Sequence, residues 1–354
     1  MTIRLPHLID VHVHLREPGA IYKEDWESGT QAALAGGIGT VLAMPNTQPA
    51  IVSAESLDDS LAAANKKAFC DYGQYIGGGQ TNSQSAAKLA EQAAGLKLYL
   101  DQTYGDLKLD EIHTWMPHFE NWPKAAPFVV HAEGKTMGTA ILLAAIYERP
   151  LHICHVSKKE EILLIRAAKE RGLPVTCEVC PHHLFLCEDD ISEIGAGRSE
   201  VRPRLAKATD KDALWENIDV IDCFASDHAP HTIEEKDSEN PPPGYPGLET
   251  MLPLLLTAVN QGRLTLEDIT LRLHENPQRI FGTAEQAESF VEVEMDSSYE
   301  IRAVEQFTRC NWTPFEGWQV KGRVRRVVIR GQAAFEDGKV LAKPGFGRNI
   351  REKE

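Results

Sequence analysis

Eight short apolar runs, each followed by a segment of helical character, constrain the fold of this chain more than any other feature. The runs are rich in Val, Ile and Leu and are mostly continuous, as expected of strands covered on both faces of a parallel sheet. The segments between them are rich in Ala, Leu, Lys and Glu. We predict strands near residues 8–14, 38–44, 71–77, 95–100, 127–132, 151–156, 175–180 and 220–226.

The intervening segments include predicted helices at 55–67, 83–94 and 159–171. Eight strand–helix alternations predict an α/β fold of the (β/α)8 TIM-barrel type. A doubly wound open sheet is the competing fold, but it normally carries a glycine-rich phosphate-binding turn after its first strand. The sequence LREPG at 15–19 is not such a turn.

The pattern of the last third of the chain predicts helices that cap the barrel and a small β appendage, both belonging to the same domain. We expect one domain over 1–354, with the barrel at about 5–285 and the appendage and tail at about 286–354. Residues 240–247 (NPPPGYPG) predict a rigid loop over the barrel mouth because proline fixes φ. Residues 248–259 and 266–273 predict capping helices. Asp337–Gly338 predicts a hairpin within the alternating segment 320–341.

Composition excludes several classes of partner. The formal net charge of −15 argues against nucleic acid and against an anionic membrane surface, so an anionic substrate needs a local cluster of cations. No run of 18 apolar residues and no signal-peptide pattern occurs. Seven cysteines without secretory features predict a reduced, cytoplasmic protein. We expect a domain excised from a longer fused chain, because the sequence begins close to the first predicted strand and ends in a charged tail.

Metal-ligand residues are predicted at one rim of the barrel. His12 and His14 lie two apart on the first strand, so both imidazoles point to one face and can bind one divalent metal. A bare H-x-H is more often part of an ordinary strand. Here, however, other strands also end in such residues, and catalytic sites of (β/α)8 enzymes lie at the carboxyl ends of the strands. These further residues are Lys97, His131, His155, Glu178 and Asp227.

Lys97 is the unusual member of this set, because an ammonium group repels a metal cation. The chemistry becomes consistent if the amine carries CO2 as a carbamate, which is anionic and has two oxygens that can bridge two metals. Two bridged metals can also activate a shared water near neutral pH.

Seven motifs together carry a resemblance to a known family. They are HVHLREPG, MPNT at 44–47, GLKLYL, HAE, HICHVS, CEVCPHHL and ASDHAPH. With them the chain resembles the dihydroorotases of the amidohydrolase superfamily from Leu5 to about Gly347. The segments 241–244 and 246–259 make it most similar to the dihydroorotase domain of the fused animal pyrimidine-synthesis protein.

The resemblance implies a two-zinc centre. His12, His14, carboxylated Lys97 and Asp227 would hold one Zn²⁺, and Lys97, His131 and His155 the second. It also implies a third zinc held by His12, Cys154 and Glu178. From ligand chemistry alone, Cys154 fits a zinc ligand and a small buried hydrophobic residue equally well.

The resemblance also implies the substrate contacts. Arg16, Asn46 and His231 would bind a carboxylate, a role that suits the bidentate guanidinium of arginine. Arg202, Pro243 and Gly244 would contact the ring or carbamoyl group. Residues 101–108 (DQTYGDLK) predict a lid that closes over the ligand, with Thr103 and Tyr104 reaching it. Nearest relatives usually have an aromatic residue without a hydroxyl at the Tyr104 position. We interpret His182 and His183 as structural.

The implied activity is the reversible cyclisation of N-carbamoyl-L-aspartate to L-dihydroorotate in pyrimidine synthesis. Asp227 would move the proton between the attacking water and the leaving nitrogen. The alternatives are another cyclic amidohydrolase (hydantoinase, dihydropyrimidinase or allantoinase) and an inactive structural homologue. The resemblance further implies a homodimer, and fusion to carbamoyl phosphate synthetase and aspartate transcarbamoylase domains in a full-length chain.

Overall fold

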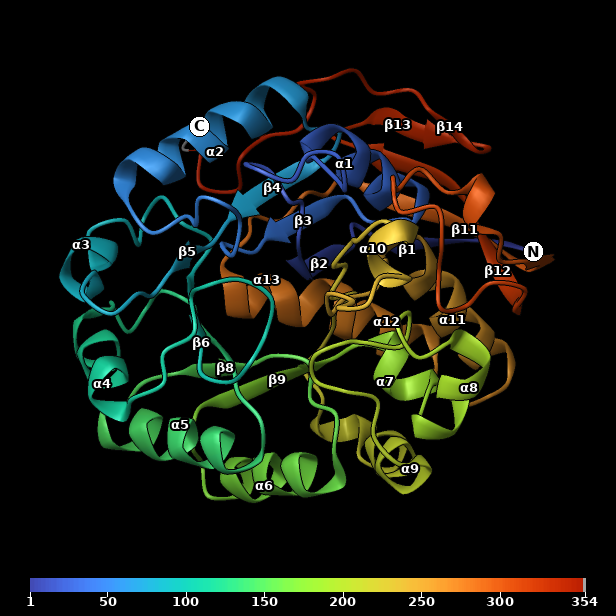
Figure 1. The fold of residues 1–354 in the computed structure, drawn as a ribbon. Helices are drawn as coiled ribbons and strands as arrows, with labels where there is room; N and C mark the ends of the chain where they lie inside the picture. Colours follow the sequence, from blue (N-terminus) through green and yellow to red (C-terminus); the bar gives the residue numbers. More distant parts are fainter. Residues whose placement is uncertain (353–354) are drawn as a thin grey trace.

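Nine short parallel strands form a closed barrel in the computed structural model, which describes residues 1–352 (Figure 1). Two hydrogen-bonded sheets make up its wall, in the orders β2-β3-β4 and β10-β9-β8-β7-β6-β5. The strands are β2 (Ile9–Val13), β3 (Thr40–Ala43), β4 (Asp71–Gln74), β5 (Ile76–Gly77), β6 (Leu96–Tyr99), β7 (Phe128–His131), β8 (Leu151–Ile153), β9 (Val175–Val179) and β10 (Cys223–Phe224).

Two junctions close the barrel. Tyr75, whose side chain is fully buried, separates β4 from β5, so one polypeptide segment passes from the smaller sheet to the larger. At the other junction, Val13 pairs in parallel with His228, and the His14 amide donates to the His228 carbonyl at 2.7 Å. The end of the first strand therefore lies beside the segment that follows the last one.

The longer helices surround the strands (Figure 1), and their apolar residues pack on the barrel wall. On α6, for example, Ile162, Ile165 and Ala168 are buried. The helices are α1 (Trp26–Ala35), α2 (Ala54–Lys67), α3 (Ser83–Ala87), α4 (Ile112–Asn121), α5 (Gly134–Ile146), α6 (Lys159–Glu170), α7 (Pro181–Phe185), α8 (Ile191–Ile194), α9 (Ala208–Glu216), α10 (Ile233–Lys236), α11 (Leu248–Asn260), α12 (Leu266–Thr270) and α13 (Asn276–Phe281). Within residues 1–352 no helix has the length and apolarity needed to cross a bilayer.

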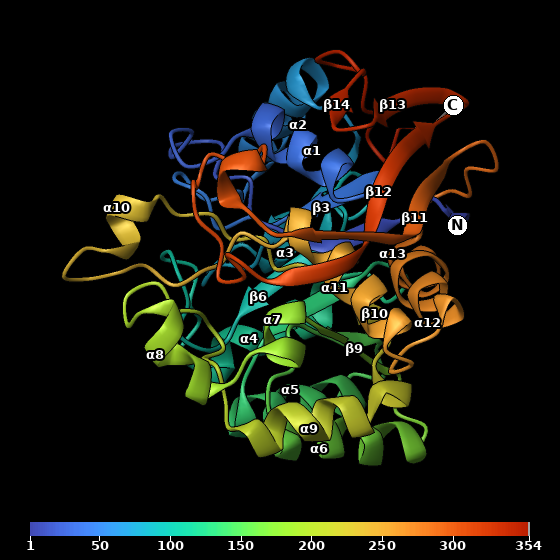
Figure 2. The ribbon, with the colours of Figure 1, turned by 90° about the vertical axis from the view of Figure 1, so that its right-hand side faces the viewer.

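A separate antiparallel sheet lies against one flank of the barrel (Figure 2). Its order is β1-β11-β12-β13-β14, with bounds β1 (Thr2–Pro6), β11 (Phe290–Glu300), β12 (Gln319–Ile329), β13 (Gln332–Glu336) and β14 (Lys339–Val340). Asp337 and Gly338 form the β13–β14 turn with positive φ of 48° and 80°, as the hairpin signal predicts. The participation of β1 was not predicted, because strand pairing over nearly 300 residues leaves no local signal.

The predicted barrel is confirmed, and its eight predicted strand regions all contain strands. Two predicted helices differ from the structure. The helix expected at 83–94 ends at Ala87, and the following residues form turns. The helix expected at 266–273 changes at Leu271 into a π-helical turn (Leu271–Glu275).

Candidate active site

One small pocket opens at the carboxyl ends of the barrel strands. Its lining residues come from most of the strand ends and from the loops that follow them. They are His12, His14, Arg16, Asn46, Tyr99, Thr103, Tyr104, His131, His155, Arg202, Asp227, Ala229, Pro243 and Gly244. Four further residues that the sequence assigns to the site are fully buried around this lining: Lys97, Cys154, Glu178 and His231.

The first strand and the last meet at a group of three potential metal ligands. The Nε2 atoms of His12 and of His14 each lie 3.2 Å from Asp227 Oδ1. The three side chains are buried, and their ligand atoms lie within 4.8 Å of one another. The other nitrogen of His14, Nδ1, lies 2.7 Å from Asn46 Oδ1, so this amide oxygen fixes the ring with Nε2 toward Asp227.

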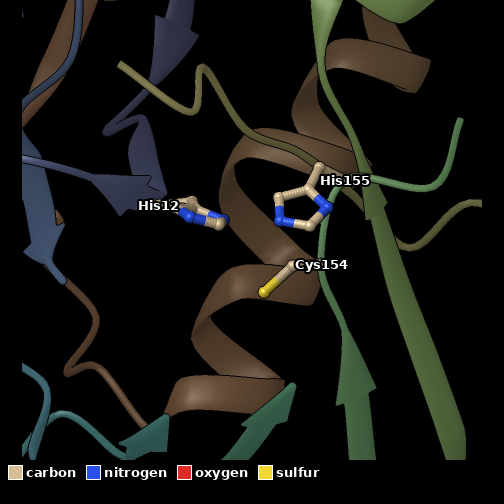
Figure 3. A group of neighbouring side chains, drawn as sticks. All are labelled: His12, Cys154 and His155. Carbon is tan, nitrogen blue, oxygen red and sulfur yellow. The ribbon is translucent and has the colours of Figure 1, made fainter. Parts of the chain in front are cut away.

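A second group joins the first strand to the end of β8 (Figure 3). The imidazoles of His12 and His155 face each other with the Cys154 sulfur beside them, and their ligand atoms lie within 4.8 Å. His131 Nδ1 lies 2.9 Å from His155 Nε2. The remaining nitrogens, His131 Nε2 and His155 Nδ1, are buried without a hydrogen-bond partner among the described residues. A divalent metal held by the facing His131 Nδ1 and His155 Nε2 would take a lone pair from each and leave the single proton of each ring on its other nitrogen.

Lys97 lies within this cluster of imidazoles. Its Nζ atom is 2.7 Å from Cys154 Sγ and 5.2 Å from the Tyr99 ring centroid. Among the described residues, the thiol is the one hydrogen-bond partner found for this fully buried amine. An ammonium group with three donors is poorly satisfied here. A carbamate on the same nitrogen would fit a metal-ligand environment better.

Glu178 orients His12 from the side away from Asp227. One carboxylate oxygen contacts His12 Nδ1, and the other lies 3.1 Å from His152 Nε2. A carboxylate on Nδ1 leaves Nε2 of His12 free to bind a metal, as in many metal sites with an outer carboxylate. The resemblance assigns Glu178 to a third zinc with His12 and Cys154, but the compact group of potential ligands found here consists of His12, Cys154 and His155.

Burial sets the charge state of the cluster. It lowers the pKa of His12, His14, His131 and His155, so these imidazoles stay neutral, which is the form that binds a metal. Burial also raises the pKa of Asp227 to about 6. Electrostatic interactions with His12 and Lys97 lower this pKa and so oppose the effect of burial.

Arg16 and the neutral, buried His231 lie together at one side of the pocket. Arg16 Nε donates to the Pro230 carbonyl at 3.0 Å, and its Nη2 atom lies 3.0 Å from His231 Nε2. Asn46, the third predicted carboxylate ligand, also lines this side. Arg202 is only partly buried and pairs with Glu200 at 2.8 Å, so it lies at the pocket edge.

The proline-rich loop supplies a wall of the pocket through Pro243 and Gly244. Gly244 has a φ of +145°, and a Cβ atom there would lie 2.4 Å from the Ala229 carbonyl oxygen. Only glycine fits this close approach. The buried Lys236 ammonium holds the loop by donating to the carbonyls of Glu200, Pro242 and Gly244.

The segment predicted as a lid lies over the pocket. Thr103 and Tyr104 both line it, and the Tyr104 carbonyl accepts a 2.9 Å hydrogen bond from Asn46 Nδ2. The Tyr104 ring packs edge-on against His231 with centroids 4.9 Å apart. Its hydroxyl lies 3.3 Å from Lys23 Nζ, so the extra oxygen of this residue has a polar neighbour.

Sequence reasoning missed four residues of the site. Lys23 contacts His231 and Tyr104 from a turn without periodicity, where nothing in the pattern distinguishes it. Tyr99 lines the pocket with a hydroxyl that has no partner in the described chain. Asp10 accepts from the amides of His12 and Ser226, and His152 pairs with Glu178. The strand alternation around His12 and Cys154 could have identified these last two.

Three site residues adopt left-handed backbone conformations. Arg16 has a φ of 54°, His155 of 35° and Asp227 of 45°. Each lies at or just beyond the end of a barrel strand. Non-glycine residues rarely adopt positive φ, and such residues concentrate at functional sites. The turn redirects each side chain into the pocket.

Comparisons with known proteins agree on one family. The model of the "Dihydro-orotase-like" family matches residues 2–102. Multifunctional protein CAD of Squalus acanthias is 56% identical over 99% of this chain, and the chain spans 16% of that protein's length. Dihydroorotase of Pyrococcus furiosus is 37% identical, with 98% of this chain and 85% of the relative covered.

Solved structures share the fold. An L-hydantoinase (dihydropyrimidinase) from Arthrobacter aurescens matches with a TM-score of 0.93 and 26% identity, covering 98% of this chain and 88% of that one. The inactive dihydroorotase-like domain of a Chaetomium thermophilum CAD-like multifunctional protein matches with a TM-score of 0.84 and 30% identity, covering 99% of both chains.

Asp227→Asn should stabilise the metal-free protein at neutral pH. The folded-state pKa of Asp227, about 6, exceeds the ordinary value of 3.8, so stability falls as the pH rises through this interval. Two pKa units correspond to about 3 kcal/mol as an upper bound. For chelator-treated protein at pH 7.5, we expect a higher urea midpoint and a gain of about 1–3 kcal/mol, shrinking toward pH 5. The exposed Asp219→Asn is the control and should change little. An unchanged Asp227→Asn midpoint at pH 7.5 would contradict this account.

Proposed function

This chain belongs to the dihydroorotase family, and we propose that it interconverts N-carbamoyl-L-aspartate and L-dihydroorotate through a zinc centre. One observation carries the proposal: Arg16, which lies 3.0 Å from the buried His231, lines the same pocket as the group of His12, His14 and Asp227. A carboxylate ligand site beside a metal-ligand set fits a substrate that carries both an acid and a cyclic amide. The 37% identity to a dihydroorotase, over nearly the whole of both chains, supports it.

The metal ions, when bound, would supply an activated water and polarise the amide carbonyl. We propose that His12, His14 and Asp227 hold one zinc and that His131 and His155 hold the second, with carboxylated Lys97 shared between them. Cys154 and Glu178 would serve a third zinc with His12. The approach of His131 Nδ1 to His155 Nε2, 2.9 Å apart, supports the second position.

The chain's own residues would orient the substrate and move the proton. Arg16, Asn46 and His231 would bind the α-carboxylate and so place the ring amide over the metal cluster. Asp227 would accept the proton of the attacking water and deliver it to the amide nitrogen as the ring opens. Thr103 and Tyr104 would exclude bulk water, while Arg202, Pro243 and Gly244 would contact the ring.

The carboxylate site is what separates this proposal from its alternatives. Hydantoins and dihydropyrimidines lack the acid, so Arg16 and His231 would have no anionic partner in a hydantoinase. An inactive homologue would be expected to lose ligands. Here every position assigned to a metal ligand carries a residue able to bind one. Both alternatives are therefore less well supported.

The setting of the domain is also a proposal. Because the chain matches 16% of a multifunctional CAD protein, we propose that it functions as a single domain within a fused cytoplasmic chain with carbamoyl phosphate synthetase and aspartate transcarbamoylase partners. A homodimer rests on the family resemblance alone.

The decisive test is a direct assay in both directions. The zinc-loaded protein should cyclise N-carbamoyl-L-aspartate and hydrolyse L-dihydroorotate, and a chelator should abolish both activities. Hydantoin and dihydrouracil, which lack the carboxylate, are the controls and should react at least about 100-fold more slowly, since the charged contacts are lost. Faster turnover of either control than of dihydroorotate would refute the proposed substrate.

Lys97→Ala should remove the bridging group. We expect activity to fall to the detection limit and bound zinc to decrease, whereas the wild type incubated with ¹³C-bicarbonate should show a carbamate carbon resonance. Lys169→Ala, which removes a lysine paired with Asp222 outside the pocket, is the matched control and should keep both properties. A fully loaded, active Lys97→Ala protein would exclude the carbamate.

The lid residues should affect turnover rather than metal content. Thr103→Ala and Tyr104→Ala should lower kcat roughly 10–100-fold, because misplaced groups and admitted water disturb the reacting geometry. Tyr104→Phe should be mild, since the ring still covers the pocket. Thr114→Ala, at an exposed hydroxyl on α4, is the control. If both alanine variants kept wild-type kcat, the segment would have no catalytic role.

A further inference from the structure

Lys23 lies beside the pocket, where it contacts both His231 and the lid residue Tyr104. It belongs to the turn between β2 and α1 and is 2% exposed. Its Nζ atom lies 3.1 Å from His231 Nδ1, 3.3 Å from the Tyr104 hydroxyl and 2.9 Å from Glu235 Oε1. A buried ammonium with these three neighbours ties three separate segments of the chain together.

We propose that Lys23 is a positioning residue of the carboxylate site, which fixes His231 as the tautomer protonated on Nε2 and holds Tyr104 over the pocket. The proposal rests on the function proposed above, and it adds a residue to which neither the family motifs nor the comparisons give a role.

The donor and acceptor chemistry determines the tautomer. Lys23 and Arg16 both offer donors only, at 3.1 Å from His231 Nδ1 and 3.0 Å from Nε2, and a neutral ring can accept from one of them. We assign the acceptor to Nδ1, because Nε2 has the Pro243 carbonyl as a neighbour to which it can donate. Burial lowers the pKa of His231, and the imidazole therefore carries a single proton. That proton lies on Nε2, which is 3.1 Å from the Pro243 carbonyl and can donate to it.

This tautomer has a consequence for Arg16. Its Nη2 atom lies 3.0 Å from the same His231 Nε2, and both atoms then carry hydrogen. Two donors side by side do not satisfy each other, but together they can donate to the two oxygens of one carboxylate. In the opposite tautomer, Nε2 would accept from Arg16 and the pair would offer the ligand one donor fewer.

The Glu235 carboxylate would favour the opposite tautomer of His231 if Lys23 were absent. Its Oε2 atom lies 3.7 Å from His231 Nδ1, so it could attract a proton to that nitrogen. Lys23 occupies this position instead and pairs with the other oxygen of Glu235. Without the ammonium, the nearest charged partner of Nδ1 is an acceptor, and the tautomer preference reverses.

The same ammonium acts on the lid. Lys23 Nζ lies 4.9 Å from the Tyr104 ring centroid, as does the Arg16 guanidinium carbon. Cation–π attraction and the hydroxyl contact therefore act together on one side chain. Tyr104 in turn packs on the His231 ring. The lid residue and the carboxylate site thus share a buried cation, and closure of the lid also excludes water from that site.

The tautomer can be measured without any activity. In protein labelled with ¹⁵N-histidine, the His231 signals are identified by their loss in His231→Gln. The wild type should show a protonated Nε2 and an unprotonated Nδ1. Lys23→Met, which keeps the length of the side chain but no charge, should move the proton wholly or partly to Nδ1. Lys169→Met is the matched control. A wild type protonated on Nδ1, or an unchanged tautomer in Lys23→Met, would overturn the proposal.

Kinetic constants can distinguish a positioning role of Lys23 from a role in the stability of the fold alone. Lys23→Met should raise KM for dihydroorotate about 10-fold or more, the size expected for one hydrogen bond to a charged group, with zinc content unchanged. Lys169→Met, which lies outside the pocket, should leave KM within about 2-fold, and Lys23→Arg should restore part of the loss because arginine also donates. An unchanged KM in Lys23→Met would refute the role.

The two proposals fail in different ways. If the wild type has no dihydroorotase activity, the proposed function fails while the tautomer measurement still tests the contact between Lys23 and His231. If Lys23→Met does not fold, the proposal is tested by the His231 tautomer of the wild type and by the KM of Lys23→Arg. A KM of Lys23→Arg raised as far as that of a His231→Gln variant would contradict the proposal.

Discussion

Closure of the barrel between its first and last strands is the interaction on which the site depends. The 2.7 Å hydrogen bond from the His14 amide to the His228 carbonyl holds β2 beside the segment that carries Asp227. This contact places two imidazoles against a carboxylate donated by a segment 213 residues away. The other candidate metal-ligand residues are brought to the same place because the parallel strands all end at the same rim.

The barrel and the grouping of His12 with His14 could be predicted because both follow from regular spacings in the sequence. Continuous apolar runs indicate buried strands, and the two-residue spacing of His12 and His14 indicates a shared face. The ligand and substrate roles assigned from the motifs stay predictions, although the structure brings those side chains into one pocket or directly around it.

Other features have no local signal. The pairing of β1 with β11 depends on residues nearly 300 positions apart, and Lys23 lies in a turn whose importance arises only from what packs around it. The left-handed conformations of Arg16, His155 and Asp227 are imposed by the requirement that side chains point inward after the strands have ended. Residue type alone does not predict these conformations, since positive φ is uncommon even for aspartate and histidine, which are enriched there, and arginine is not.

The long separation of the residues that close the barrel also orders events during synthesis. Contacts that join such distant segments form late in folding, because the loop between them must be closed first. A nascent chain that has left the ribosome through β9 already carries His12, His14, His131 and His155, but not Asp227. Such an intermediate has every barrel strand but the last, and it lacks the carboxylate that lies 3.2 Å from both His12 and His14 in the closed barrel. The proposed metal site would therefore be complete only once the barrel has closed, as one of the last steps of folding.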